Sequence, residues 1–174
     1  MLGDHEFTAI SLGIWHTCAL DEDGTVWCWG RGSSGRLGNG EAMDRDVPVA
    51  VSGGHVFATI TSGGDFNCGL TTTRKVYCWG WNRYGQLGSG STDDNSLVPV
   101  PVAGSMEFRA VSAGHQHACG ATAQGGVVCW GRAESDGQAF RLGATPTETC
   151  GPENAPCSRS PLVVPVPASA TTVS

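Results

Sequence analysis

Charged side chains are scarce in this 174-residue chain, where they make up 15% of the residues and give a formal net charge of −6. Lys75 is the only lysine, and the nine arginines are scattered. Nucleic-acid-binding proteins normally gather basic residues into a stripe that neutralises phosphates. We therefore expect no nucleic-acid partner. Three short acidic groups fall in expected turns, which is typical of solvated turn residues: Asp21-Glu22-Asp23, Asp44 with Asp46, and Asp93-Asp94.

Long hydrophobic runs are also missing, since no stretch approaches the length of a membrane-spanning helix. We therefore expect no insertion into a membrane. The segment from Met1 to Glu6 is polar and lacks the apolar core of a secretory signal. Either export is directed by a segment outside this chain, or the protein stays inside the cell.

Signatures of catalysis and of cofactor binding are lacking as well. No serine stands in a nucleophile-elbow pattern, and no pair of carboxylates repeats at a fixed separation. The glycine-rich segments 30–40 and 80–90 lack the Lys-Ser/Thr ending of a phosphate loop, and Asp93-Asp94-Asn95 lacks the spacing of a calcium loop. His16 and His117 share a repeat position with Phe66, which indicates packing. We expect no enzyme activity, no cofactor and no metal.

Glycine (26), cysteine (8) and tryptophan (6) are abundant instead, and they recur in register. Two sets of three cysteines repeat at spacings of 50 and 51 residues, and each second cysteine opens a Cys-Trp-Gly triplet. A Gly-x-Leu-Gly segment and then a Val-Pro-Val segment follow each triplet, the third Gly-x-Leu-Gly being split. The repeated features are Cys18, Cys68 and Cys119; Cys28, Cys78 and Cys129; Gly35–Gly38, Gly85–Gly88, and Gly137-Gln138 with Leu142-Gly143; Val47–Val49, Val98–Val100 and Val164–Val166.

These features define three repeats of one domain, at about 7–52, 57–103 and 108–167. Residues 168–174 are expected to form the first strand of a further repeat, because Ala170–Ser174 resembles Phe7–Ser11. The third repeat carries about fifteen extra residues that include Cys150 and Cys157. Insertions within a repeat usually map to loops on one face, often the binding face.

Each repeat predicts four short strands. In the first repeat these are Phe7–Ser11, His16–Leu20, Thr25–Gly30 and the segment Val47–Val49. Pro48 cannot donate to a strand ladder, so the last strand should be an outer one. Four antiparallel strands per repeat of this length form the blade of a β-propeller, and we expect an all-β fold.

The cysteine spacing predicts a disulfide within each hairpin. With Glu22-Asp23-Gly24 as a three-residue loop, Cys18 faces Cys28 within disulfide range. The same register opposes Cys68 to Cys78 and Cys119 to Cys129, and Cys150 with Cys157 would close the inserted loop. In the second repeat Arg74 takes the glycine position, so that turn is strained or of another type. Zinc sites favour cysteines closer in sequence. Four such pairs indicate an oxidising compartment, which favours an extracellular or cell-surface location.

The segments Gly13–Leu20, Gly24–Gly30 and Gly35–Gly40 resemble the repeat of the regulator-of-chromosome-condensation family. The cysteine-bearing form is similar to the variety found in bacterial surface and secreted proteins. The resemblance implies a propeller, and family members usually close a ring of about seven blades. Three repeats leave open edges, so either the chain is part of a longer propeller or copies of it associate. We favour a homo-oligomer, in which the terminal strand completes a neighbour's blade.

Residues that do not recur are the candidates for binding a partner. Trp15 and Trp81 stand where the other repeats have polar residues, and Trp81 lies beside Arg83 and Tyr84. Exposed aromatic residues next to arginine are typical contact anchors, although partial burial in a loop is the alternative. We predict a non-catalytic, secreted or surface scaffold for protein interactions. The alternatives are a structural self-assembling unit and a carbohydrate-binding propeller.

Overall fold

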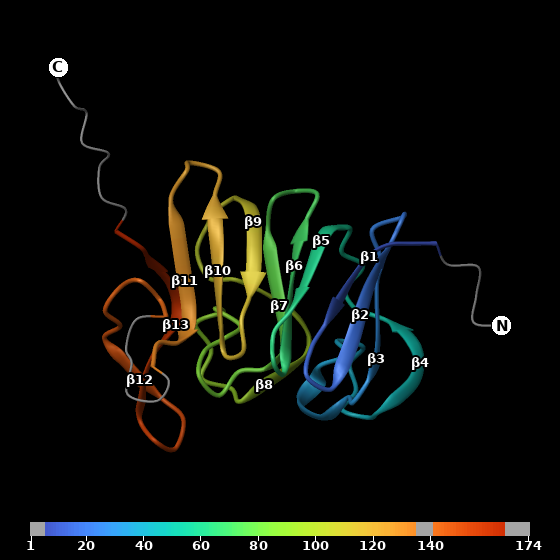
Figure 1. Ribbon diagram of the computed structural model, residues 1–174, viewed down its shortest axis with the longest axis horizontal. Helices are drawn as coiled ribbons and strands as arrows, with labels where there is room; N and C mark the ends of the chain where they lie inside the picture. Colours follow the sequence, from blue (N-terminus) through green and yellow to red (C-terminus); the bar gives the residue numbers. More distant parts are fainter. Residues whose placement is uncertain (1–5, 135–140, 166–174) are drawn as a thin grey trace.

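A computed structural model of the chain describes residues 6–134 and 141–165. It contains three antiparallel sheets, one for each repeat, and this confirms the all-β expectation (Figure 1). The first sheet holds β1 (Phe7–Leu12), β2 (His16–Asp21), β3 (Val26–Gly30) and β4 (Arg45–Ala50), with a short 3₁₀ turn η1 (Ser33–Gly35) before β4. The second holds β5 (Phe57–Ser62), β6 (Phe66–Thr71), β7 (Val76–Trp81) and β8 (Asn95–Pro101). The third holds β9 (Phe108–Ala113), β10 (His117–Thr122), β11 (Val127–Arg132), β12 (Glu148–Cys150) and β13 (Ala155–Val163).

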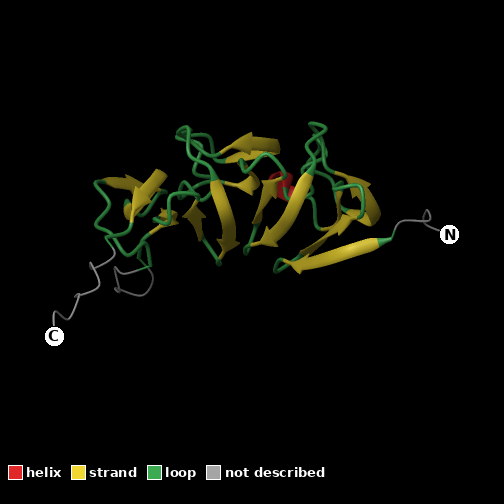
Figure 2. Cartoon of the chain, turned by 90° about the horizontal axis from the view of Figure 1, so that it is seen from above, coloured by secondary structure: helices red, strands yellow, loops and turns green. Residues whose placement is uncertain are grey.

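The three sheets stand side by side as blades of an open arc (Figures 1 and 2). Adjacent blades meet through their first two strands, since β5 contacts β1 and β2, and β9 contacts β5 and β6. Long connections leave β3, β7 and β11 at one end of the arc, and tight hairpin turns join the second and third strands at the other end (Figure 1). Within the described part of the chain, no helix has the length and apolar character needed to cross a membrane.

The central hairpin of each blade has the predicted register. Cys18 lies opposite Cys28, and the equivalent cysteines of the other two blades are opposed in the same way. All three pairs form disulfides with Cα–Cα distances of 4.1 Å. Gly24 has a φ of +81° and Arg74 a φ of +63°, so the second hairpin uses the same turn. Arg74 therefore adopts a left-handed backbone conformation, which residues with a Cβ disfavour.

The core lies between the blades, because the disulfides of the first and second blades each pack against aromatic residues of the following blade. Trp79 is fully buried and its Nε1 donates to the backbone oxygen of Arg36 at 3.1 Å, while Leu37 packs in the same cluster. A Cβ on Gly38 would approach Trp79 to 2.7 Å. Trp130 repeats this arrangement one blade later. The Gly-x-Leu-Gly segment therefore receives the indole of the next Cys-Trp-Gly triplet.

The outer strand of the third blade differs from the prediction. Leu162 lies opposite Cys129, just as Val49 lies opposite Cys28, so Ser160-Pro161-Leu162 occupies the place that we assigned to Val164–Val166. That assignment was wrong, because the insertion shifts the spacing and two x-Pro-x segments compete for one position. Val164 follows the strand and donates to Val127 at 2.9 Å. The strand predicted at 168–174 and the Gly137-Gln138 pair lie outside the described residues.

Candidate functional site

The insertion in the third repeat forms a β-hairpin whose turn projects from the end of the arc that carries the long connections (Figure 1). β12 pairs with the start of β13, and the Cys150–Cys157 disulfide joins the two strands. Gly151 has a φ of +72° and Asn154 a φ of +51°, which closes the turn tightly. Pro152, Glu153 and Asn154 are exposed at the tip. We call residues 148–159 the disulfide hairpin.

Tyr84 of the second blade packs against this hairpin. Its hydroxyl donates to Oε2 of Glu153 at 2.6 Å, and the guanidinium of Arg132 lies 4.5 Å from the centre of its ring. Trp81 packs edge-on against the ring at 5.4 Å, and a Cβ on Gly151 would approach the ring to 2.6 Å. Burial raises the pKa of the Tyr84 phenol, and its hydrogen bond to Glu153 raises it further. Two blades and the insertion therefore meet around one aromatic ring.

The burial of Tyr84 corrects one sequence prediction. Only 4% of this residue is exposed, so it holds the hairpin in place and is not itself a contact residue. Arg83 is exposed, with its Nη2 3.6 Å from Oδ2 of Asp94 in the same loop, and Trp81 is half-buried. We call the surface formed by Trp81, Arg83, Asp94 and the hairpin tip 152–154 the hairpin surface.

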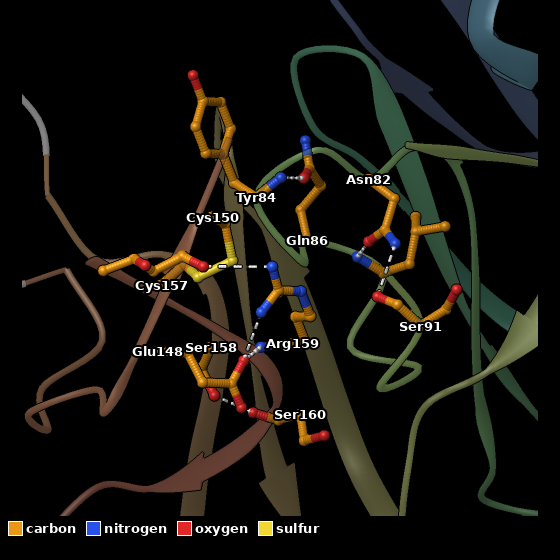
Figure 3. Close-up of a disulfide and its surroundings, with 12 residues drawn as sticks. Asn82, Tyr84, Gln86, Ser91, Glu148, Cys150, Cys157, Ser158, Arg159 and Ser160 are labelled. Carbon is orange, nitrogen blue, oxygen red and sulfur yellow. Dashed lines mark hydrogen bonds and ion pairs between the residues drawn. A yellow bond between two sulfur atoms is a disulfide. The ribbon is translucent and has the colours of Figure 1, made fainter. Parts of the chain in front are cut away.

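The strands of the hairpin are also held by charge. Arg159 on β13 donates through Nη1 to Oε2 of Glu148 at 3.2 Å and through Nη2 to the backbone oxygen of Thr149 at 3.2 Å (Figure 3). Glu148, Cys150 and Cys157 place their ligand atoms within 4.8 Å of one another. Because both sulfurs are joined in the disulfide, the oxidised hairpin offers no thiolate to a metal ion.

Trp15 is not part of this surface. It is 59% exposed in the loop between β1 and β2 of the first blade. The equivalent position in the second blade is Asp65, which forms a 2.9 Å ion pair with Arg36 across the blade boundary. Arg132 and Glu153, in contrast, belong to the site but were not predicted. Arg132 could have been predicted, because it occupies the repeat position of Trp81. No local sequence pattern pointed to Glu153.

The two histidines that share a repeat position with Phe66 differ in burial, since His16 is buried and His117 is half-buried. His16 is 4% exposed, and its Nε2 lies 2.8 Å from Oδ1 of Asn67, while Phe66 fills the equivalent position in the next blade. Burial lowers the pKa of His16 and that of His117, and Arg141 also lowers the latter. Both imidazoles therefore favour the neutral form.

Sequence comparison places these repeats among known ones. A family model described as the regulator of chromosome condensation (RCC1) repeat matches residues 75–121, and a second model with the same description matches 7–36, 50–86 and 108–138. The chain is 42% identical over 48 residues to the Arabidopsis thaliana ultraviolet-B receptor UVR8, covering 28% of this chain and 11% of the receptor. It is 39% identical over 44 residues to the human E3 ubiquitin-protein ligase HERC2, covering 25% of this chain and 1% of the ligase.

Solved structures show the same fold. Yeast RCC1 (Prp20), in its crystal structure with Kap60, aligns with a TM-score of 0.76 at 23% identity, over 94% of this chain and 38% of that one. Human WBSCR16 aligns with a TM-score of 0.76 at 22% identity, over 94% and 39%. The chain thus spans well under half the length of these proteins. Because the second family model alone matches more than half of its residues, in all three repeats, the chain belongs to the regulator-of-chromosome-condensation repeat family.

Proposed function

We propose that this chain is a non-catalytic, secreted or cell-surface scaffold that binds a protein partner through the hairpin surface. The observation that carries the proposal is the way the disulfide hairpin is held. It departs from the repeat, yet it is fixed by its own disulfide, by the Arg159–Glu148 pair and by the buried ring of Tyr84. A segment held at so many points presents its tip in one conformation.

Such preorganisation favours binding, because little conformational freedom remains to be lost when a partner docks. The chemistry of the tip suits a protein surface. Half-buried Trp81 offers an aromatic contact, and Arg83, Asp94 and Glu153 surround it with charges of both signs. Aromatic residues and arginine are enriched among the residues that dominate binding energies. That yeast RCC1 was crystallised bound to Kap60 supports protein binding as a use of this fold.

The extracellular or surface location is supported by the cysteines. The structure pairs all eight of them in four disulfides. Disulfides persist in oxidising compartments and are rare where thiols are kept reduced. The test is the mass of protein isolated from its source under acid quench. Eight hydrogens fewer than the fully reduced mass are expected, and free thiols would overturn the assignment.

The binding proposal is tested with the hairpin surface reversed in charge. The double variant Arg83→Glu/Glu153→Lys keeps the net charge and should lose at least tenfold in affinity for a partner captured from extracellular fractions and then purified. The swap Arg109→Glu/Glu107→Lys is the matched control, since it also keeps the net charge and both residues are exposed at the start of β9, away from the hairpin. Equal loss in both variants, or in neither, would contradict the proposal. Retention by a glycan array that is lost in Trp81→Ala would indicate sugar binding instead.

A further inference from the structure

The chain makes the same blade-to-blade interface twice, with equivalent atoms each time. The backbone nitrogen of the first residue of a blade donates to the turn of the preceding blade, as from Phe57 to Gly24 at 2.8 Å and from Phe108 to Arg74 at 2.9 Å. Ser11 and Thr61 accept through their hydroxyls from the next inner strand. The indoles of Trp79 and Trp130 donate to Arg36 and Gln86 at 3.1 and 2.9 Å. For the indole, each interface thus has a donor half on the later blade and an acceptor half on the earlier one, while backbone hydrogen bonds run both ways, as from Ile14 to Gly64 at 3.1 Å.

The first blade presents the donor half of such an interface, and several of its apolar side chains are exposed in the described chain. Ile10 is 63% exposed, Leu12 70% and Ile14 51%, and Trp15 is exposed beside them. Trp29 is only half-buried, whereas Trp79 at the same repeat position is fully buried. We call the surface of Ile10, Leu12, Ile14, Trp15 and Trp29 the N-terminal face.

The third blade presents the acceptor half. Val127 and Cys119 are half-buried, whereas Val26 and Cys18 at the same positions in the first blade are 1% and 0% exposed. Leu162 and Val164 lie on the same side. An open apolar hollow of about 220 Å³ adjoins them, and Ser112 lines it at the position where Ser11 and Thr61 accept hydrogen bonds. We call this surface the C-terminal face.

The acceptor loop of the third blade has the backbone of the loops that receive an indole, but Val164 lies in the indole's place. A Cβ on Gly143 would approach Val164 to 2.8 Å, where Gly38 and Gly88 meet Trp79 and Trp130, so a docking indole would displace this valine. Gly143 has a φ of +64°, and Gly38 and Gly88 both have a φ of +65°. Leu142 is fully buried beside it, as Leu37 and Leu87 are in their own loops. The carbonyl that precedes this leucine is therefore set as the equivalent carbonyl is in the two interfaces that the chain completes.

We propose that the N-terminal face of one copy of this chain docks on the C-terminal face of a second copy. The two faces are the two halves of an interface that the chain already forms, so a second copy supplies the matching indole and apolar strand. The inference does not depend on the hairpin surface. The contact is heterologous, and repetition of one such contact gives a closed ring where the rotation closes.

The residue types of the N-terminal face are more apolar than those of an ordinary blade edge, which favours a face that binds a partner. Leu12, Ile14 and Trp15 occupy positions that hold Ser62, Gly64 and Asp65 in the second blade. The first blade is thus more apolar than the completed interface requires. A face-to-face contact between two N-terminal faces would cover these residues as well, but it would leave the indole of Trp29 without the acceptor loop.

The experiment is native mass spectrometry of the full chain from about 1 to about 100 µM, at and above the weak end of the affinities that standard-size interfaces show, with three variants. Ile10→Asp places a charge on the N-terminal face, and Val127→Asp places one on the C-terminal face. Met43→Asp is the matched control, because Met43 is 59% exposed but lies on neither face. Circular dichroism and urea melts confirm that each variant folds; a variant that does not is replaced by Leu12→Asp or Val164→Asp.

The wild type and Met43→Asp are expected to form a discrete multiple of the chain mass, and each face variant should be a monomer. An equimolar mixture of the two face variants should form a heterodimer, since one intact interface remains between them. Loss of assembly in Ile10→Asp alone would indicate N-terminal faces paired with each other and would overturn the proposal. So would a wild type that remains monomeric up to 100 µM (an upper limit well above typical interface dissociation constants).

Discussion

Trp29 and Trp79 occupy the same position in successive repeats, and truncating each to alanine separates the contribution of the blade boundary from that of the blade itself. Trp79 is fully buried against the first blade, with its Nε1 3.1 Å from the carbonyl of Arg36. Trp29 has the same strand environment within its own blade but is half-buried. Any difference in destabilisation therefore comes from the neighbouring blade.

The magnitude follows from burial. Trp79→Ala should lower the free energy of unfolding by about 3–5 kcal/mol, the usual range for a buried aromatic side chain. Loss of the indole donor adds little, because the same Arg36 carbonyl also accepts from Nδ2 of Asn67 at 2.7 Å. Trp29→Ala should cost roughly half as much, about 2 kcal/mol, since about half of the contact area is absent.

Urea denaturation followed by far-ultraviolet circular dichroism gives both values, at a concentration where native mass spectrometry shows only monomer. The two midpoints should differ by about 1 M for a slope of about 2 kcal/mol per M. Repeating the melts at a concentration where copies associate should raise the cost of Trp29→Ala toward that of Trp79→Ala. Equal costs in the monomer would refute the reasoning, because they would show that the adjoining blade contributes nothing.

Three other predictions concern the turns, the histidines and the disulfides. Arg74→Gly removes the strain of a left-handed backbone at a residue with a side chain and should raise the free energy of unfolding by about 0.5–1 kcal/mol. Gly125→Ala, whose added Cβ meets nothing within 4 Å, should lower it by a similar amount, and thermal melts of both variants test this. Burial lowers the pKa of His16 and His117 below the ordinary value of 6.5, so the unfolded chain binds protons more readily than the folded one. The free energy of unfolding should therefore be constant above about pH 6.5 and fall as the pH is lowered below that value. His16→Phe should weaken this pH dependence. Replacing Cys68 and Cys78 together by alanine should lower the free energy of unfolding by about 3 kcal/mol in urea melts. Replacing Cys150 and Cys157 should instead leave the blades intact and speed amide hydrogen exchange only in the disulfide hairpin. Faster exchange in β9 to β11 as well would contradict a hairpin that is independent of the blades.

The blades could be predicted from the sequence because their order is local. A three-residue turn fixes which residues face each other, so Cys18 and Cys28 are paired once the turn is placed. The outer strand of the third blade was missed for the converse reason. Its register depends on how a long connection returns to β11, and the sequence offers both Ser160-Pro161-Leu162 and Val164–Val166 for one position.

The burial of Tyr84 depended on a contact that no local pattern encodes. An aromatic residue beside Arg83 in a loop has the composition of a contact anchor. The segment that covers it reaches it through Glu153, 69 residues further along the chain. A repeat pattern predicts which residues of one blade contact the next blade. An insertion has no equivalent in the other repeats, so the repeat pattern does not show where it packs.

The blade interfaces rest mainly on backbone atoms, cysteines and the recurring indole, which leaves other positions free to differ between repeats. Arg36 and Gln86 illustrate this, since both offer their carbonyl to an indole while their side chains bond to Asp65 and to the nitrogen of Tyr84. Positions that differ therefore show where a blade meets something other than a standard neighbour. Trp81 differs from its equivalents where the disulfide hairpin docks, and Trp15 differs where the first blade has no neighbour in the described chain. The same comparison thus distinguishes the surface that we propose for a foreign partner from the one that we propose for another copy of the chain.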